Sequence, residues 1–423
     1  MRDSNGKPTV VVTGMGIITS LGAGKEDNWA RLAAGTSGIR RINRFPNASL
    51  KTTIAGTVDF VPVEPFCSTE LGERMAILAV EEAIAQSGIG TKGDFPGPLF
   101  LAVAPVELEW PHRETLAAAS GDTDKIGYDS MLRASASGRF HAIHERCLLA
   151  SVAEHLAARF GTKGSPISVS TACASGASAI QLGVEAIRRG EADAALCAGT
   201  DGSVNPECLI RFSLLSALST ANDPPQEAAK PFSKNRDGFV MAEGAAALVL
   251  ENYAAAKARG VRILGVLSGC GEMADSFHRT RSSPDGKAII GCIRNAISDA
   301  GLVPDDIDYI NPHGTGTPEN DKMEYIGVSA VFGERAKSIP VSSNKSMIGH
   351  TLSAAGAVEA VFTLLTLQNQ RVPPTINYRI PDPAIPLDVV PNTARDAKVR
   401  HALSNSFGFG GQNVSLVISG EPQ

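Results

Sequence analysis

Several features are scarce or missing in this sequence of 423 residues, and each absence excludes a class of protein. The chain has seven cysteines, an odd number, and no two of them are spaced as Cys-x-x-Cys. A disulfide framework and a structural zinc site are therefore not expected, whereas a reducing compartment is. Aromatic residues make up only 5% of the chain. No apolar run reaches the roughly 18 residues that a membrane span needs, so we expect a cytoplasmic protein without such a span.

An excess of positive charge is also missing. The 39 lysines and arginines stand against 44 acidic residues, which gives a formal net charge of −5. No general basic field is present that could hold nucleic acid, so a nucleic-acid partner is not expected. Short basic groups, such as Arg279 with Arg281, are expected to be solvated surface residues or, alternatively, docking points for an acidic partner.

Two motifs that could bind a cofactor or a metal are incomplete. The stretch TVVVTGMGIITSL at 9–21 lacks the third glycine of the dinucleotide fingerprint. The same stretch is interrupted by Gly14 and Gly16, so it is predicted to be a strand and turn rather than a signal peptide. His141 and His144 could share one helix face, but no third ligand accompanies them. Neither a cofactor nor a metal is expected from these motifs.

The composition that remains fits an α/β protein with a large core. Hydrophobic residues make up 43% and charged residues 20% of the chain, which is an ordinary globular balance. The 42 glycines are about a tenth of the chain, above the usual ~7%. This excess fits a fold with many tight turns between strands and helices.

The sequence contains an internal repeat. Four segments recur in the same order: 79–89 with 292–302, 167–171 with 339–343, 184–187 with 358–361, and 244–250 with 412–418. The shared order predicts two related halves, 1–262 and 263–423, in which strands and helices alternate. Such alternation predicts mainly parallel sheets buried between helices. Residues 105–150 have no counterpart in the second half and are expected to be an insertion that shapes a binding face.

Cys173 is the strongest candidate for a nucleophile. It lies in ISVSTACASGASAIQLGVEAIRR at 167–189, where a strand is predicted to end near Thr171 and a helix to begin near Ser175. The dipole and free N–H groups of a helix N-terminus favour a thiolate, so the pKa of this thiol is expected to be lowered. The small residues around it leave room for a substrate. The other six cysteines are expected to be buried and unreactive.

Two histidines follow predicted strands of the second half. His313 lies in the turn of IDYINPHGTGTPENDKMEY, and His350 begins a helix in IPVSSNKSMIGHTLSAAGAVEAV. The repeat sets residues 343–345 opposite 171–173, so both histidines are expected near the cysteine. A cysteine with two histidines is too few groups for a zinc site unless a fourth ligand is present, whereas acyl transfer needs this set of groups. We therefore expect acyl-transfer chemistry and no metal here.

These motifs stand in a fixed order along the chain: TACASG around Cys173, PHGTGTPENDKME around His313, NKSMIGHTLSAAGAVEA around Lys345 and His350, and NSFGFGGQN at 405–413. Together they resemble the β-ketoacyl-acyl carrier protein synthases, and most closely the type II elongating condensing enzymes. The likeness continues through 10–22, 236–251 and 372–377. It covers nearly the whole chain except about 105–150.

The resemblance implies a fold and a reaction. The fold would be thiolase-like, with two pseudo-symmetric halves in five αβαβα layers, usually as a homodimer and with no cofactor. The activity would be that of a 3-oxoacyl-[acyl-carrier-protein] synthase, an acyltransferase of fatty acid chain elongation. Cys173 would take an acyl group from acyl carrier protein. Malonyl-acyl carrier protein would then lose CO₂, and its enolate would attack the acyl-Cys carbonyl in a decarboxylative Claisen condensation.

The resemblance also implies roles for single residues in this chemistry. His313 and His350 would donate hydrogen bonds to the malonyl thioester oxygen, on which negative charge builds during decarboxylation. The backbone N–H groups of Cys173 and Phe409 would hold the oxyanion of the acyl carbonyl. Phe409 would also act as a gate, since its glycine neighbours let it swing.

Further residues are implied to support the site or to contact the substrate. Lys345 would orient and tune the two histidines, and Asp321 and Glu324 would support both the histidine loop and that lysine. The remaining residues would contact the pantetheine arm or the acyl chain: Thr315, Thr317, Phe212 and Phe407.

Some departures from the family pattern concern the substrate. The segment AVAPVELEWP after the predicted 99–104 strand replaces a short glycine-rich turn, and Ser216 stands where an arginine is common. TELGER, before the 75–87 helix, carries two glutamates where basic residues often dock the carrier protein. The acyl length and the carrier protein therefore stay open, and a specialised long-chain or polyketide product is an alternative to fatty acid elongation.

Three related classes of protein are alternatives to the expected enzyme. A non-catalytic chain-length partner subunit would generally lack the nucleophile, whereas Cys173 is present. A thiolase would use a second catalytic cysteine in the C-terminal half, where the last cysteine is Cys292, within a predicted helix. A starter-unit enzyme with a Cys-His-Asn set could use Asn405, but Lys345 and His350 favour the type with two histidines.

Overall fold

The computed structural model describes residues 1–3, 5–105, 107–120 and 127–421. Within these residues the strands form two sets with the same spatial order. The first set runs β6 (Ile167–Val169), β5 (Leu99–Ala102), β7 (Ala194–Asp201), β8 (Gly244–Asn252) and β1 (Val10–Thr19). The second set runs β10 (Tyr309–Asn311), β13 (His401–Phe407), β14 (Gln412–Ser419) and β9 (Gly265–Ala274).

The second set is completed by a single bridge. Val341 pairs in parallel with Ile310 of β10, in the place that β6 occupies beside β5. The two sets meet where β1 pairs with β9, with Val11 opposite Val266. Each half of the chain therefore builds the same arrangement, with five strands in the first half and four strands and the bridge at Val341 in the second.

The pairing directions differ from the sequence prediction. Strand β8 runs antiparallel to both β1 and β7, and β14 runs antiparallel to both β9 and β13. Parallel pairing is confined to the outer strands of each set. The prediction of mainly parallel sheets is wrong because β13 and β14 are joined by only residues 408–411, which is too short for a crossover helix.

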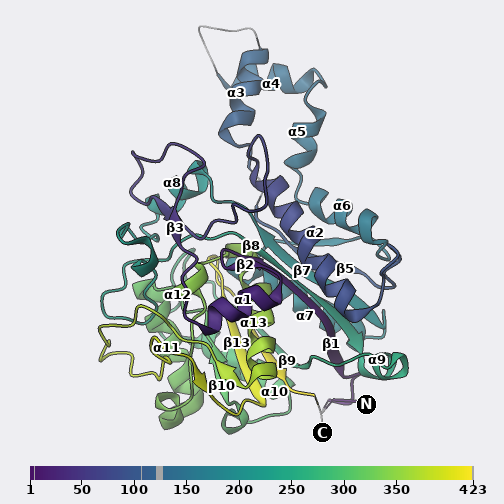
Figure 1. The fold of residues 1–423 in the computed structure, drawn as a ribbon, viewed down its shortest axis with the longest axis vertical. Coiled ribbons are helices and arrows are strands. Elements are labelled where there is room, and N and C mark those ends of the chain that lie inside the picture. Colours follow the sequence, from purple (N-terminus) through teal and green to yellow (C-terminus); the bar gives the residue numbers. More distant parts are fainter. Residues whose placement is uncertain (4, 106, 121–126, 422–423) are drawn as a thin grey trace.

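Helices cover both faces of the two sets of strands in five layers (Figure 1). Helix α2 (Ser68–Ser87) packs on β1 and β8, and helix α10 (Lys287–Asp299) packs on β9 and β14. Between the sheets lie α7 (Ser175–Arg188) and α13 (Ala355–Asn369). Helix α13 is buried from residue 355 to 367, as expected for a helix that is apolar on nearly every side. The predicted layered architecture of two halves is confirmed.

The repeated segments occupy equivalent elements. They fall on α2 and α10, on β6 and the bridge at Val341, on α7 and α13, and on β8 and β14. The proposed boundary between 262 and 263 lies in the connection from α9 (Tyr253–Arg259) to β9. The other elements are α1 (Lys25–Ala33), β2 (Gly22–Ala23), β3 (Arg40–Arg41), β4 (Ile54–Ala55), α6 (Ser151–Phe160), α8 (Pro206–Leu214), α11 (Pro318–Phe332), α12 (Lys345–Ile348), β11 (Arg371–Val372) and β12 (Arg395–Asp396).

One detail of the predicted symmetry is wrong. The residue opposite Cys173 is Ser353 rather than Lys345, because the turns 172–174 and 352–354 have the same form and each precedes a middle-layer helix. Both turns begin with a positive φ, 50° at Ala172 and 45° at Leu352. The second half therefore holds an additional segment before its turn, and Lys345 lies in that segment.

The predicted insertion projects from the body of the molecule. Helices α3 (Trp110–Ala119), α4 (Tyr128–Ala136) and α5 (His141–Arg146) extend away from the sheets (Figure 1). Residues 106 and 121–126 of the 105–150 segment lie outside the described residues. Whether this segment shapes a binding face stays a prediction.

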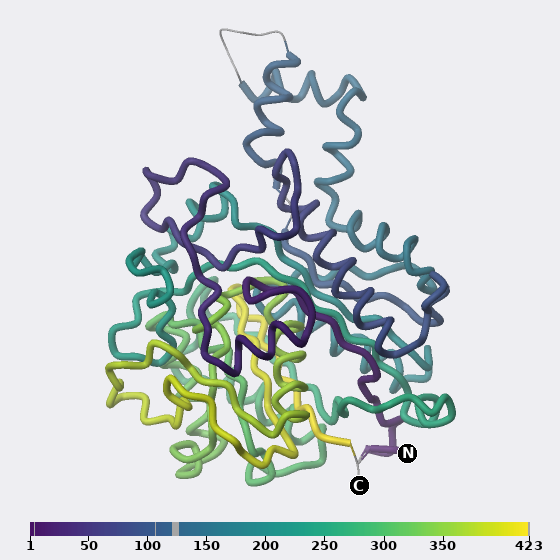
Figure 2. The backbone as a smooth tube through the Cα atoms, in the orientation of Figure 1, coloured from purple at the N-terminus to yellow at the C-terminus, as the bar shows by residue number. Residues whose placement is uncertain are grey.

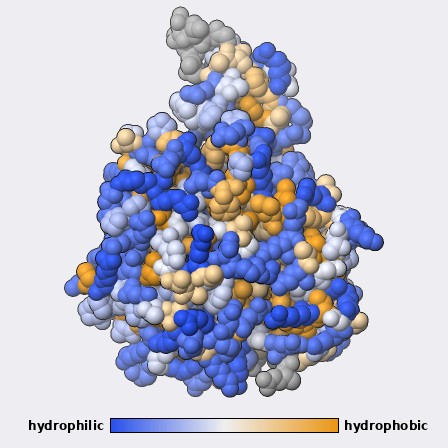
Figure 3. All heavy atoms as spheres, viewed as in Figure 1, coloured by the Kyte–Doolittle hydropathy of each residue, from blue (hydrophilic) through white to orange (hydrophobic). Residues whose placement is uncertain are grey.

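The ends of the described chain lie close together (Figure 2), where residues 1–3 and 420–421 line one groove. In the view of Figure 3 the surface is mostly hydrophilic, with apolar residues in small groups. Among the described residues, no helix is both long enough and apolar enough to cross a membrane.

Candidate active site

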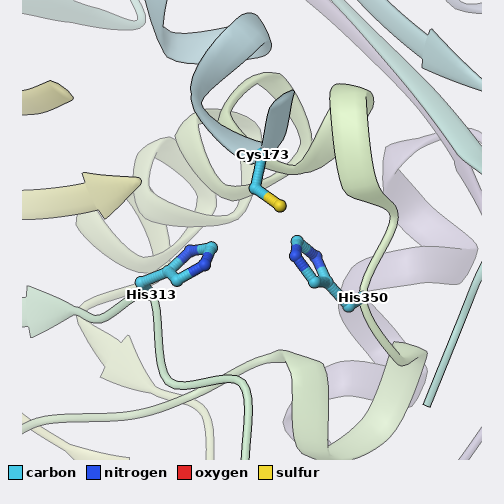
Figure 4. Close-up of side chains that lie close together, drawn as sticks. All are labelled: Cys173, His313 and His350. Carbon is cyan, nitrogen blue, oxygen red and sulfur yellow. The ribbon is translucent and has the colours of Figure 1, made fainter. Parts of the chain in front are cut away.

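Three side chains from separate segments meet in one buried cluster (Figure 4). Cys173 lies in the turn 172–174 directly before α7, as predicted. His313 follows β10, and His350 follows α12. The three side chains each place a sulfur or nitrogen atom within 4.8 Å of the others. Their exposed fractions are 8%, 3% and 1%, so water has little access to the cluster.

The two imidazoles are held at right angles. Their ring centroids are 5.2 Å apart with an interplanar angle of 83°, and Phe239 packs edge-on against His350 at 5.3 Å. The backbone N–H of Leu352 donates to Nδ1 of His350 at 3.3 Å. A neutral imidazole that accepts on Nδ1 carries its proton on Nε2. This Nε2 has no partner among the described residues, so it can donate to a bound group.

Burial and a nearby cation keep both histidines neutral. Desolvation lowers the pKa of His313 and of His350 well below 6.5, and the charge of Lys345 lowers both further. Lys345 is itself buried and forms an ion pair with Glu359 of α13. The support expected for this lysine from Asp321 and Glu324 is therefore supplied by Glu359. A glutamate within the fully apolar stretch of α13 was the sequence signal for it.

Two acidic residues fix the loop that carries His313. The carboxylate of Glu324 accepts hydrogen bonds from the backbone N–H groups of His313 at 2.8 Å and Gly314 at 2.7 Å. Burial raises the pKa of Glu324 to about 7. The carboxylate of Asp321 accepts from the backbone N–H groups of Gly316 at 3.1 Å and Phe232 at 2.6 Å. The predicted support of the loop is thus present as hydrogen bonds to its backbone.

The thiol of Cys173 differs from the sequence prediction. Burial raises its pKa to about 11, although the backbone N–H of Phe409 donates to the sulfur and the charge of Lys345 also favours the thiolate. The expected lowering of the pKa is wrong because complete desolvation outweighs these two contributions. The resting group is a thiol that must lose its proton when it reacts.

The cluster forms the floor of a pocket of about 480 Å³. All the residues predicted to contact substrate line it, together with the catalytic candidates: Cys173, Phe212, His313, Thr315, Thr317, His350, Phe407 and Phe409. Lys345, Asp321 and Glu324 are buried behind this lining. The pocket also holds the exposed cations Arg279, Arg281 and Lys322, for which no ion pair is present among the described residues.

Comparison with known proteins agrees with this geometry. Residues 7–256 match the sequence model described as the beta-ketoacyl synthase N-terminal domain, and residues 264–379 match that of the C-terminal domain. The chain belongs to the β-ketoacyl synthase family. It is 36% identical to 3-oxoacyl-[acyl-carrier-protein] synthase 2 of Coxiella burnetii, over 98% of this chain and 99% of that protein. It is also 36% identical to putative polyketide beta-ketoacyl synthase 1 of Streptomyces cyaneus, over 97% and 98%.

Solved structures give the same family and fold. A β-ketoacyl synthase from Burkholderia phymatum superposes with a TM-score of 0.83 at 31% identity, over 98% of this chain and all of the other. A type II polyketide ketosynthase solved in complex with its acyl-carrier protein superposes with a TM-score of 0.86 at 32% identity, over the same shares. This β-ketoacyl synthase therefore has the predicted thiolase-like fold.

The structure also bears on the alternative residue sets. In this β-ketoacyl synthase the amide of Asn405 donates to Glu324 at 3.2 Å and accepts from Ser415 at 2.8 Å, so both ends are engaged behind the pocket. Cys292 is buried in α10, where its thiol donates to the carbonyl of Gly271. Neither residue lines the pocket of the synthase.

Cys173, His313 and His350 supply three atoms of the kinds that ligate metals. Among the described residues no carboxylate belongs to this set. The positive charge of Lys345 acts on both histidines and on the thiol, and it opposes a divalent cation at the same place. The arrangement in the synthase therefore suits an anion that forms during reaction better than a metal ion.

Proposed function

We propose that this β-ketoacyl synthase condenses an acyl group carried on Cys173 with malonyl-acyl carrier protein, with loss of CO₂, to give a 3-oxoacyl-carrier protein in fatty acid chain elongation. One observation carries the proposal. A buried thiol and two buried neutral imidazoles share a single pocket, and the Nε2 of His350 is free to donate.

Acyl transfer to the enzyme is the first step. The sulfur of Cys173 attacks the acyl thioester carbonyl, and the carrier thiol leaves with a proton that balances the one lost by the cysteine. The backbone N–H groups of Cys173 and Phe409 hold the oxyanion, as the hydrogen bond from Phe409 N–H to the sulfur supports. Gly410 next to Phe409 has φ 89°, a conformation that glycine adopts readily, which suits a gating movement of the aromatic ring.

Decarboxylation and condensation form the second step. The malonyl thioester loses CO₂, and the negative charge that develops on its thioester oxygen is stabilised by donors from His313 and His350. The enolate carbon then attacks the acyl carbonyl, and the bond to Cys173 breaks to release the thiolate. Burial, with a smaller contribution from the charge of Lys345, holds both histidines neutral, so that each keeps its single proton as a hydrogen-bond donor.

An acyl carrier protein is the proposed partner. Its phosphopantetheine arm carries an anionic phosphate, and Arg279, Arg281 and Lys322 supply positive charge at the pocket. Among the described residues that line the pocket, Glu319 is the one acidic residue. This placement favours docking of an acidic partner by Arg279 and Arg281 over the interpretation of these residues as solvated surface groups.

We further propose that the enzyme is a cytoplasmic homodimer. Strand β6 ends the sheet, so one of its edges has no strand beside it among the described residues, and Ile167 is 45% exposed. An unpaired edge is a template for pairing with a second copy. All seven cysteines are free, which suits a reducing compartment. Light scattering coupled to size exclusion would test the dimer, and a monomeric mass would contradict it.

Adduct mass measurements with acyl-carrier proteins of graded chain length would test the reaction. Wild type should gain one acyl group, and Cys173→Ala should gain none; equal loading would contradict the assigned nucleophile. His313→Ala should still load but should release CO₂ from malonyl-carrier protein far more slowly. The chain length that loads fastest also decides between fatty acid elongation and the alternative of a specialised long-chain or polyketide product, which the unusual AVAPVELEWP segment motivates.

A further inference from the structure

A second cluster of potential metal ligands lies away from the catalytic pocket. Cys67, Glu109 and His112 each place one ligand atom within 4.8 Å of the other two. Cys67 precedes helix α2, while Glu109 and His112 lie at the start of α3, the first helix of the projection. The cluster therefore joins the projection to the body of the enzyme at the place where the projection begins.

The three side chains are held so that they can share one ion. Glu109 and His112 are three residues apart at the start of one helix, a spacing that sets two side chains on the same face. The carboxylate of Glu109 is fixed by hydrogen bonds from the backbone N–H of Ser68 at 3.0 Å and from the amide of Asn205 at 3.1 Å. The Nδ1 atom of His112 is buried and has no partner among the described residues. An imidazole nitrogen left without a partner is a ready metal ligand.

The charges at the cluster also fit a divalent cation. Glu109 is only 5% exposed, and no ion pair to it is present among the described residues. Cys67 is 2% exposed, and burial together with the charge of Glu109 raises the pKa of its thiol, although the backbone N–H groups of Thr69 and Glu70 donate to the sulfur. A thiolate and a carboxylate carry two negative charges, which one divalent ion neutralises. Arg146, the cation that acts on the thiol, is engaged by Glu70 at 2.9 Å.

We propose that Cys67, Glu109 and His112 form a Zn²⁺ site that ties α3 to the N-terminus of α2. One sulfur, one nitrogen and one oxygen ligand suit zinc, and water takes the fourth position of the tetrahedron. Binding releases the thiol proton of Cys67 to solvent, so no oxidation or reduction occurs. His112 is partly exposed, which gives the ion a path from solvent. The site is independent of the condensation reaction, because Cys67, Glu109 and His112 do not line its pocket.

Metal titration of the full chain tests the site. The protein is stripped with a chelator, and Zn²⁺ alone is added back in competition with a chromophoric chelator. Titration in a Cys173→Ala background removes the catalytic cysteine as a ligand. We expect about one Zn²⁺ per chain in that background, and a thiolate-to-cobalt absorption band when Co²⁺ replaces zinc. Zn²⁺ should also raise the melting temperature, since it binds only the folded chain.

Ligand variants in the same background separate this site from others. Cys67→Ser and His112→Ala should each weaken zinc binding by at least about tenfold, and Cys67→Ser should also lose the cobalt band. The double variant His141→Ala/His144→Ala removes two histidines from the same projection and should bind zinc as before. Wild-type affinity in Cys67→Ser, loss of binding in the histidine double variant, or no zinc in the starting protein would overturn the proposal. Circular dichroism of each variant checks that the fold is retained.

Discussion

The ion pair between Lys345 and Glu359 offers a way to separate stability from catalysis. Both side chains are almost completely buried, with exposed fractions of 2% and 1%. Replacing Lys345 by Met leaves the Glu359 carboxylate buried without its cation, which costs about 3–5 kcal/mol of unfolding free energy. In the double variant Lys345→Met/Glu359→Gln, no charge remains to be compensated. We therefore expect most of that loss to be recovered.

Catalysis should respond differently from stability. The double variant still lacks the positive charge of Lys345 beside the two histidines, which favours the anion that forms on decarboxylation. The release of CO₂ from malonyl-carrier protein should therefore stay low although the fold has recovered. Denaturant unfolding measures the stability of each variant, and CO₂ release by enzyme preloaded with an acyl group measures its catalysis. The conservative variant Lys345→Arg is the control, because it keeps the positive charge but not the native geometry of the ammonium group. If the double variant regained both stability and CO₂ release, the lysine would have only a structural role and our reasoning about the histidines would be refuted.

Three other predictions follow from the same geometry. Because burial lowers the pKa of both site histidines, the unfolded chain takes up protons below pH 6.5 that the native chain does not. Each histidine should therefore lower the unfolding free energy by about 1.4 kcal/mol per pH unit below 6.5. This contribution is measured as the difference between wild type and His350→Ala, because the pKa values of Glu243, Glu324 and Glu359, raised to about 7 by burial, act in the opposite direction in both proteins. CO₂ release should stay constant through pH 6.5, and a rate that halves there would contradict neutral donors of low pKa. The double variant Arg279→Glu/Arg281→Glu should raise KM for malonyl-carrier protein at least about tenfold, and kcat and turnover of a malonyl thioester without phosphate should not change. An equal loss with that small thioester would rule out a docking role. Gly176→Ala should lower the unfolding free energy by about 1–3 kcal/mol, because its Cβ would lie 2.5 Å from a backbone nitrogen of α13. Gly72→Ala, whose Cβ would meet nothing closer than 3.5 Å, is the matched control, and equal melting temperatures for the two variants would contradict the close approach.

Several elements could be predicted because their signals are local. The strand, turn and helix around Cys173 follow from a short apolar run and a cluster of small residues, and the structure has them at 167–169, 172–174 and 175–188. The order of four repeated segments was sufficient to predict two related halves. The direction of a strand has no such local signal, because it depends on the length of chain that connects neighbouring strands. Strands β8 and β14 run antiparallel to their neighbours, contrary to the prediction.

The electrostatics of the site could not be predicted in the same way. A helix N-terminus alone predicts a lowered pKa for the Cys173 thiol, but burial by segments from the whole chain raises the pKa to about 11. The ion-pair partner of Lys345 could not be predicted either. Glu359 lies fourteen residues further along the chain and contacts the lysine only when α12 and α13 pack together. The signal that remained was a lone glutamate in an apolar helix.

The sequence by itself determined the family, the two halves and the identity of the cysteine and histidines, because motif order and small-residue turns are properties of the chain as written. Only the tertiary structure decided the protonation of those groups, the partners that hold them and the proximity of Cys67 to Glu109 and His112. These depend on desolvation and on distances between residues far apart in the chain. Desolvation and these distances are both set by packing, which is present only in the folded protein.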